Sequence, residues 1–186
     1  MFLNLLTGIG LSTAAGFRVF IPLLTMSVAS YYGIISPPDN FEWIASSQAI
    51  TILSIATISE LIAYEIPWFN NIVNMISIPF ATVAGILLTA SFLTEVSPLH
   101  QWSLAIIAGG GTALATDVFS NTAQVAVTTA TGGTANPILS LFESAITIII
   151  SMIVILAITL PIALIIIPFI LMLFRSTVKS KRLKQG

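Results

Sequence analysis

The stretch GLSTAAGFRVFIPLL, residues 10–24, places one arginine inside an apolar run that is typical of a membrane-buried helix. Arg18 follows Gly10 and Gly16 and precedes Pro22. A charged side chain near the bilayer centre costs at least about 2.5–3.5 kcal/mol, so it normally has a partner or lines a water-filled cavity. The sequence therefore predicts a polar site around Arg18 at membrane depth.

The composition of the whole chain indicates a membrane protein with several spans. Of its 186 residues 56% are hydrophobic and only 7% are charged, whereas about a quarter of the residues in a soluble domain are charged. Apolar runs long enough to cross the bilayer recur along the sequence. We predict a single transmembrane domain over residues 1–176, with six spans at about 3–33, 47–65, 70–93, 102–130, 138–159 and 161–176. The last two spans lack a polar loop between them, so residues 138–176 form one span or two.

The basic residues predict the orientation of the chain. Every one of them except Arg18 lies near the C-terminus: Arg175, Lys179, Lys181, Arg182 and Lys184. Because cytoplasmic segments carry an excess of Lys and Arg, the tail at 177–186 is expected in the cytoplasm. Six spans then place the N-terminus there too, with the loops that hold Asp39, Glu42 and Glu95 outside.

A predicted internal repeat defines the expected fold. Residues 10–20, GLSTAAGFRVF, align with residues 109–119, GGGTALATDVF, and this alignment sets Arg18 opposite Asp117. Three predicted spans separate the copies, and an odd number of crossings inverts the second copy. We therefore expect an all-α integral membrane protein with two inverted three-helix repeats, at about 1–95 and 100–176, whose first helices are long or interrupted. Inverted repeats of this kind recur in transporters.

Small residues in the two copies, and prolines outside them, are predicted to have structural roles. Interrupted helices in corresponding places of two halves point to a binding site. Alternatively, the small residues form stripes that let helices pack closely. Both interpretations stay open for the set Gly10, Gly16, Pro22, Gly109, Gly110, Gly111 and Pro137.

Ionisable and amide side chains within the apolar runs are candidates for binding a solute or ion. Arg18 and Asp117 either form a structural ion pair or bind an anion at the first and a cation or proton at the second. Glu143 lies near the start of a span, where it either caps the helix dipole or lines a cytoplasmic mouth. The predicted site consists of Arg18, Asp117, Glu60, Glu143, Asn121 and Asn74.

Signatures of an enzyme are missing from the sequence. The chain has no cysteine and one histidine, His100, which excludes thiolate nucleophiles and histidine-rich metal sites. The run GGGTALAT lacks the lysine of a phosphate-binding loop. We expect no catalytic activity, no cofactor and no bound metal. The expected partners are the lipid bilayer, a small polar solute or ion, and a second copy of the chain if it forms a homo-oligomer; nucleic acid is not expected.

Three segments together resemble a bacterial family of small multi-pass membrane proteins catalogued as domain of unknown function 4126. They are GLSTAAGFRVFIPLL, AYEIPWFNN before the third span and NPILSLFES before the fifth. The resemblance marks Arg18, Pro22, Asn136, Pro137, Ser140 and Glu143 as family positions and implies the inner membrane of a bacterium. The chain departs from the family pattern at Tyr64, Asn70, Ala81 and Thr82 and near Asp117, as a divergent member would. The family carries no settled activity.

Two functions remain open at this point. The first is a transporter or channel for a small polar solute or ion, with a central site at the repeat interface. The second is a non-transporting membrane scaffold or assembly factor, in which Arg18 and Asp117 form a structural salt bridge.

Overall fold

The segment that carries Arg18 folds as two helices with a break between them, α1 (Phe2–Phe17) and α2 (Phe20–Tyr31). The structure is a computed structural model that describes residues 2–157, of which 67–72, 74 and 75 are described by their backbone alone. Pro22 accounts for the break, because a proline ring inside a helix clashes with the carbonyl four residues earlier, here that of Arg18. In the first turn of a new helix the same proline is well tolerated. The predicted interruption of this first segment is confirmed.

The rest of the described chain is helical, with no β-strand within residues 2–157. In order, the elements are a 3₁₀-helix η1 (Asp39–Ala45), α3 (Ser47–Glu65), α4 (Pro67–Phe92), α5 (Pro98–Leu104), a π-helix η2 (Ala105–Gly110), α6 (Gly111–Thr131) and the helix Asn136–Ala157. The elements α5, η2 and α6 form one continuous helix. The second copy, residues 109–119, therefore begins in the π-helix, continues as α6 and is not broken. Asn121 occupies the position that corresponds to Pro22.

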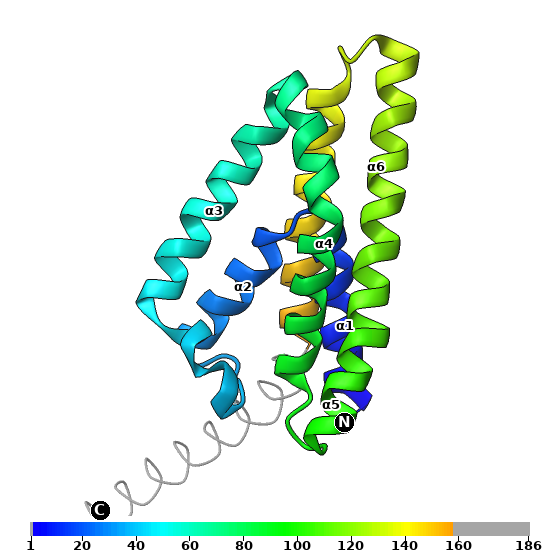
Figure 1. The fold of residues 1–186 in the computed structure, drawn as a ribbon. Helices are drawn as coiled ribbons and strands as arrows, with labels where there is room; N and C mark the ends of the chain where they lie inside the picture. The colour runs from blue at the N-terminus through cyan, green and yellow to red at the C-terminus, as the bar shows by residue number, and fades with distance from the viewer. Residues whose placement is uncertain (1, 158–186) are drawn as a thin grey trace, which may run out of the picture. The chain divides into compact units, whose positions relative to one another are not determined.

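The helices α1 and α2 form a hairpin that enters the bundle from one end and returns to that same end (Figure 1). Near this end, a Cβ atom built on Gly8 of α1 would lie 2.7 Å from the Cα atom of Thr89. The Ser91 hydroxyl donates to the sulfur of Met26 on α2 at 3.3 Å. Thr89 and Ser91 both belong to the last turn of α4. The hairpin therefore does not cross the bundle, and the prediction of one span over 3–33 is wrong.

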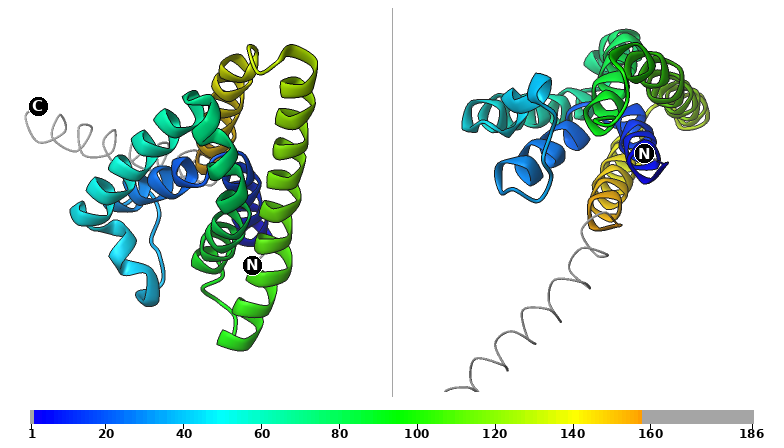
Figure 2. Two further views of the ribbon diagram at one scale, coloured as in Figure 1. Left: turned by 45° about the horizontal axis from the view of Figure 1, so that its top comes forward. Right: turned by 90° about the horizontal axis from the view of Figure 1, so that it is seen from below.

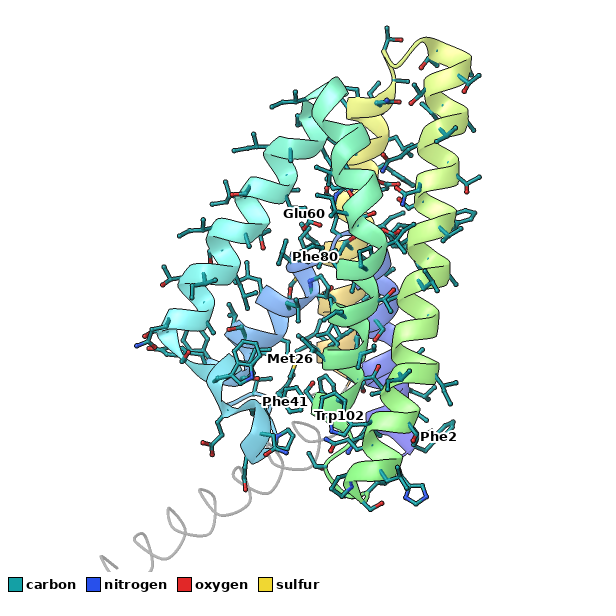
Figure 3. The ribbon with its side chains drawn as sticks, in the orientation of Figure 1. Phe2, Met26, Phe41, Glu60, Phe80 and Trp102 are labelled. Atoms are coloured by element: carbon teal, nitrogen blue, oxygen red, sulfur yellow. The ribbon has the colours of Figure 1, made fainter. Side chains whose placement is uncertain are left out.

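The return of the hairpin also corrects the predicted topology of the first loop. The N-terminal end of α1 and the 3₁₀-helix with Asp39 and Glu42 lie at the same end of the bundle (Figures 1 and 3). At that end, the rings of Phe41 and Trp102 lie 6.4 Å apart. The prediction that the N-terminus lies opposite the loop of Asp39 is wrong, because α2 brings the chain back before α3 begins.

The two copies of the predicted repeat lie on helices that run in the same direction. Gly8 of α1 and Gly109 of η2 both lie against Thr89, and Gly16 lies against Thr116 of α6. Only α3 and α4 cross the bundle between the copies, and an even number of crossings preserves direction. The inverted arrangement predicted for these two segments is therefore not found in the part of the chain that the structure describes.

Three of the described helices are long and apolar enough to cross a membrane: α3, the continuous helix Pro98–Thr131 and the helix Asn136–Ala157. The helix α4, with 26 residues, is about 39 Å long at the rise of an α-helix. The predicted spans at 47–65, 70–93, 102–130 and 138–159 thus each correspond to a helix. The predicted span at 161–176 and the basic tail lie outside the described residues.

The distribution of side chains also suggests a membrane protein. Along α3, Ile52, Ile55, Ile58 and Ile62 are each more than half exposed, whereas Arg18 is completely buried. Buried charges surrounded by outward-facing apolar side chains are expected in a lipid environment. The chain divides into two units, Met1–Ile155 and Leu156–Gly186, and the first contains this polar interior. Within it, α2 and α3 lie side by side, away from α6 (Figure 2).

Glycines allow the helices of the bundle to approach closely. A Cβ atom on Gly16 would lie 2.5 Å from the carbonyl oxygen of Ala113, and one on Gly10 would lie 2.8 Å from Val154. Gly109 and Gly110 face α4 at similarly short distances, and Pro137 lies at the start of its helix. Gly111 has no described neighbour within 4 Å of such an atom, so close packing of the described helices does not require a glycine there.

We expect Gly16→Ala to destabilise the folded protein by about 1–3 kcal/mol, because the added methyl group overpacks the contact between α1 and α6. The matched control is Gly111→Ala, which adds a methyl group in open space and removes a helical glycine, and is expected to be neutral or slightly stabilising. Unfolding of both variants in detergent measures the difference. Equal stability of the two variants would contradict the close approach of these helices.

Candidate functional site

Arg18 lies at the tip of the hairpin and binds one face of the helix Asn136–Ala157. Its Nε donates to the Ser144 hydroxyl at 3.1 Å, and its Nη2 donates to the Ser140 hydroxyl at 2.9 Å and to the Ser140 carbonyl at 3.1 Å. The same Nη2 lies 3.3 Å from Oε2 of Glu143, with which it forms an ion pair. The predicted ion pair between Arg18 and Asp117 is therefore wrong.

The other contacts of Arg18 close the break in the hairpin. Nη1 donates to the Phe17 carbonyl at 3.2 Å, one of the carbonyls that lack a partner where α1 ends. The ring of Tyr64, on α3, covers the guanidinium at 3.8 Å from its central carbon to the ring centroid. A cation over an aromatic face is stabilised by the ring quadrupole, most strongly when water is excluded. Arg18 thus joins α1, α3 and the helix Asn136–Ala157.

Glu60, also on α3, binds the backbone where α2 begins. Its Oε1 accepts from the Val19 amide at 2.8 Å, and its Oε2 accepts from the Phe20 amide at 3.1 Å. Amides at the start of a helix have no partner within that helix, and the helix dipole there favours a negative charge. Glu60 therefore supplies from a distant helix the cap that the local sequence lacks.

Glu143 is held between Arg18 and two donors on α6. The Ser120 hydroxyl donates to its Oε1, and the Gln124 amide donates to its Oε2 at 2.9 Å. Glu143 lies seven residues after Asn136, beyond the first helical turn in which the dipole acts on a charge. Its role is thus that of an ion-pair partner, and the interpretation as a helix cap is wrong.

Asp117 belongs to a second polar group beside the first. It is 3% exposed, and Asn121 donates to its Oδ2 at 2.9 Å and to the Ser77 hydroxyl at 3.3 Å. Ser77 is also hydrogen-bonded to Asp117. No described basic residue forms an ion pair with Asp117. Its carboxylate is therefore held by neutral hydrogen-bonding partners from α4 and α6.

A cavity of about 410 Å³ lies between α2, α3 and α4, next to the break in the hairpin. Apolar side chains such as Phe80 form most of its wall, and Glu60 lies on its α3 side (Figure 3). The polar residues Tyr64 and Ser77 line it as well. The cavity thus touches the Arg18 group through Glu60 and Tyr64, and the Asp117 group through Ser77.

The structure brings most of the predicted site residues together. Arg18 forms an ion pair with Glu143, and Glu60 binds the backbone immediately after Arg18. Asn121 binds Asp117 in the second group. The side chain of Asn74 lies outside the described residues.

The predicted site left out several residues that complete it, although the family resemblance marked Ser140. Ser140 and Ser144 are spaced by one helical turn around Glu143, a pattern that could have revealed a polar helix face. Ser120 and Gln124 share the same four-residue spacing on α6. For Tyr64 the sequence contains no comparable signal, since its role depends on the position of a distant arginine.

The comparisons with known proteins place the chain in a family without assigning an activity. Residues 5–179 match the family described as Domain of unknown function (DUF4126). The searches of curated proteins and of solved structures gave no match. Two of the segments that carry the family resemblance, GFRVF and NPILSLFES, contribute the two partners of the Arg18–Glu143 ion pair. The chain belongs to the DUF4126 family of proteins of unknown function.

Proposed function

We propose that this protein is a membrane transporter or channel for a small polar solute or ion, with its site at the tip of the α1–α2 hairpin. The observation that carries the proposal is the tip itself, where a broken helix meets buried Arg18, Glu60 and Glu143 beside a cavity of about 410 Å³. Non-helical backbone at membrane depth is tolerated where it is buried in protein or lines a water-filled cavity. Discontinuous helices form the substrate sites of many transporters.

The arrangement of the two polar groups supports a path for a solute. The cavity reaches Glu60 on one side and Ser77 on the other, so a solute entering it meets both groups. Exchange of hydrogen bonds among these side chains supplies the alternative states that transport requires. We propose further that the protein crosses the bacterial inner membrane several times with its C-terminus in the cytoplasm. We propose no enzymatic activity for it.

A second candidate function is that of a non-transporting scaffold or assembly factor. The observation in its favour is that Arg18 is fully satisfied by an ion pair, hydrogen bonds and an aromatic ring. A buried network of this kind specifies one packing of helices without moving a solute. The structural salt bridge in this alternative is that between Arg18 and Glu143.

Flux through proteoliposomes tests the proposal. Purified protein is expected to carry at least one ion or small solute from a panel that includes protons, alkali cations, halides and short carboxylates. Asp117→Asn is nearly isosteric and is expected to lower that flux at least tenfold while the protein still folds, because it removes the carboxylate that binds Asn121 and Ser77 in the second polar group. The matched control is Asp39→Asn, which neutralises an exposed carboxylate at the end of the bundle.

Two results decide between the candidate functions. Equal flux in the wild type, Asp117→Asn and Asp39→Asn would contradict a path that runs from the hairpin tip past the Asp117 group. The absence of flux for the whole panel, together with a stoichiometric partner protein after purification, would favour the scaffold.

A further inference from the structure

We infer that the first turn of α2 is a binding site for a small monovalent anion, and that in this structure the Glu60 carboxylate occupies it as a tethered substitute for that anion. The inference rests on the proposed function and deepens it, because it assigns the chemical class of the solute. The Glu60 carboxylate, which is covalently part of the protein, occupies the position in which a free carboxylate or a halide would bind.

The contacts of Glu60 are those of a bound anion. Each of its two oxygens accepts one backbone amide, at 2.8 Å from Val19 and 3.1 Å from Phe20. The helix that begins there has 12 residues, so its dipole adds to the attraction of the amides. Arg18 precedes these amides directly in the chain, and its charge attracts the Glu60 carboxylate.

A second observation, independent of the helix end, also points to a ligand with acceptor atoms. The Tyr64 side chain is 4% exposed and lines the same cavity as Glu60. No hydrogen bond joins its hydroxyl to any residue that the structure describes. A phenolic hydroxyl is a good donor to an anion. Tyr64 therefore brings into the cavity wall, one helical turn after Glu60 on α3, a donor that no described residue uses.

The charges around the cavity favour an anion over a cation. A cation would need a free carboxylate in the cavity, but Glu143 is paired with Arg18, and Glu60 is bound to two amides. Asp117 has no described basic partner, but it is held by Asn121 and Ser77 and does not line the cavity. An anion that enters the cavity replaces the Glu60 carboxylate as the acceptor of the same two amides. The start of α2 therefore still binds one negative charge. The displaced Glu60 side chain remains within the cavity, whose volume is about 410 Å³.

The Glu60→Ala variant tests this inference, since it leaves the amides of Val19 and Phe20 without their carboxylate. Thermal unfolding of the full chain is measured in detergent with potassium formate, with potassium chloride and with potassium gluconate, whose anion is too bulky, at equal ionic strength. We expect formate or chloride to raise the unfolding midpoint of Glu60→Ala saturably, by several degrees relative to gluconate. The wild type is expected to respond weakly, because Glu60 already fills the site.

Ser59→Ala is the matched control, because Ser59 lines the same cavity but makes no hydrogen bond to these amides. If Glu60→Ala does not fold, Glu60→Gln replaces it, since a neutral amide binds the two donors less well and is more easily displaced. An equal response to formate, chloride and gluconate in the Glu60 variant overturns the inference, as does an equal response in Ser59→Ala.

The flux assay separates this inference from the proposed function. Flux of a cation without saturable anion stabilisation overturns the anion site and leaves transport standing. Anion stabilisation without flux of any solute supports the anion site and overturns transport. Flux of formate or chloride that increases in Glu60→Ala supports both, because removal of the tethered carboxylate opens the site.

Discussion

Replacing Arg18 with methionine is expected to destabilise the folded protein by about 3–5 kcal/mol, because removal of one partner of a buried ion pair leaves the other charge uncompensated. Glu143 is 3% exposed and, among the described residues, would retain Ser120 and Gln124 as its hydrogen-bond donors. The hydroxyls of Ser140 and Ser144 would also lose the donor that they now accept from. Reversible unfolding in mixed micelles measures the loss.

A double-mutant cycle identifies the true partner of Arg18. Adding Glu143→Gln to Arg18→Met removes the orphaned charge, so we expect a coupling energy of about 0.5–3 kcal/mol between the two positions. Asp117→Asn in the Arg18→Met background is the matched control and is expected to be additive, since Asp117 forms no ion pair with Arg18 among the described contacts. Coupling to Asp117 with none to Glu143 would contradict the observed pairing.

Replacing Tyr64 with alanine has the second largest expected effect. Truncation of a buried aromatic side chain costs about 3–5 kcal/mol, and the loss of a ring over a desolvated guanidinium adds to it. Because Tyr64 also lines the cavity, the effect is expected near the lower end of that range. Unfolding in the same micelles measures it.

Tyr64→Phe is the control for this prediction, because it retains the ring 3.8 Å from the Arg18 guanidinium and removes only the hydroxyl. We expect it to be within about 0.5 kcal/mol of the wild type, since the hydroxyl binds no described residue. A loss as large as that of Tyr64→Ala would show that the hydroxyl, and not the ring, stabilises the fold.

Much of the helical content could be predicted from the sequence, because it follows from local apolar runs. The helices α3, α4, α6 and Asn136–Ala157 lie where runs of the required length predicted them. The relative directions of the helices could not be predicted in the same way. One helix that turns back changes the direction of every later helix relative to the N-terminus, and the inverted repeat failed for this reason.

The pairing within the site was also beyond the sequence. Arg18, Glu60, Asp117 and Glu143 stand out in an apolar chain, and all four prove to be buried near the hairpin tip. The alignment of the two copies nevertheless suggested the wrong partner for Arg18. Equivalent positions on parallel neighbouring helices lie near each other, but which carboxylate an arginine reaches depends on a third helix, here Asn136–Ala157.

The sequence by itself determined that this protein is helical, that its helices suit a membrane and that a few charges lie inside it, since these properties depend on composition and local pattern. Only the tertiary structure decided whether a proline interrupts its helix. Pro79 lies inside α4, which continues through it, whereas the chain breaks before Pro22 and turns back. At Pro22 the freed backbone groups bind Glu60 from α3 and the Arg18 side chain, and such distant partners exist only once the chain is folded.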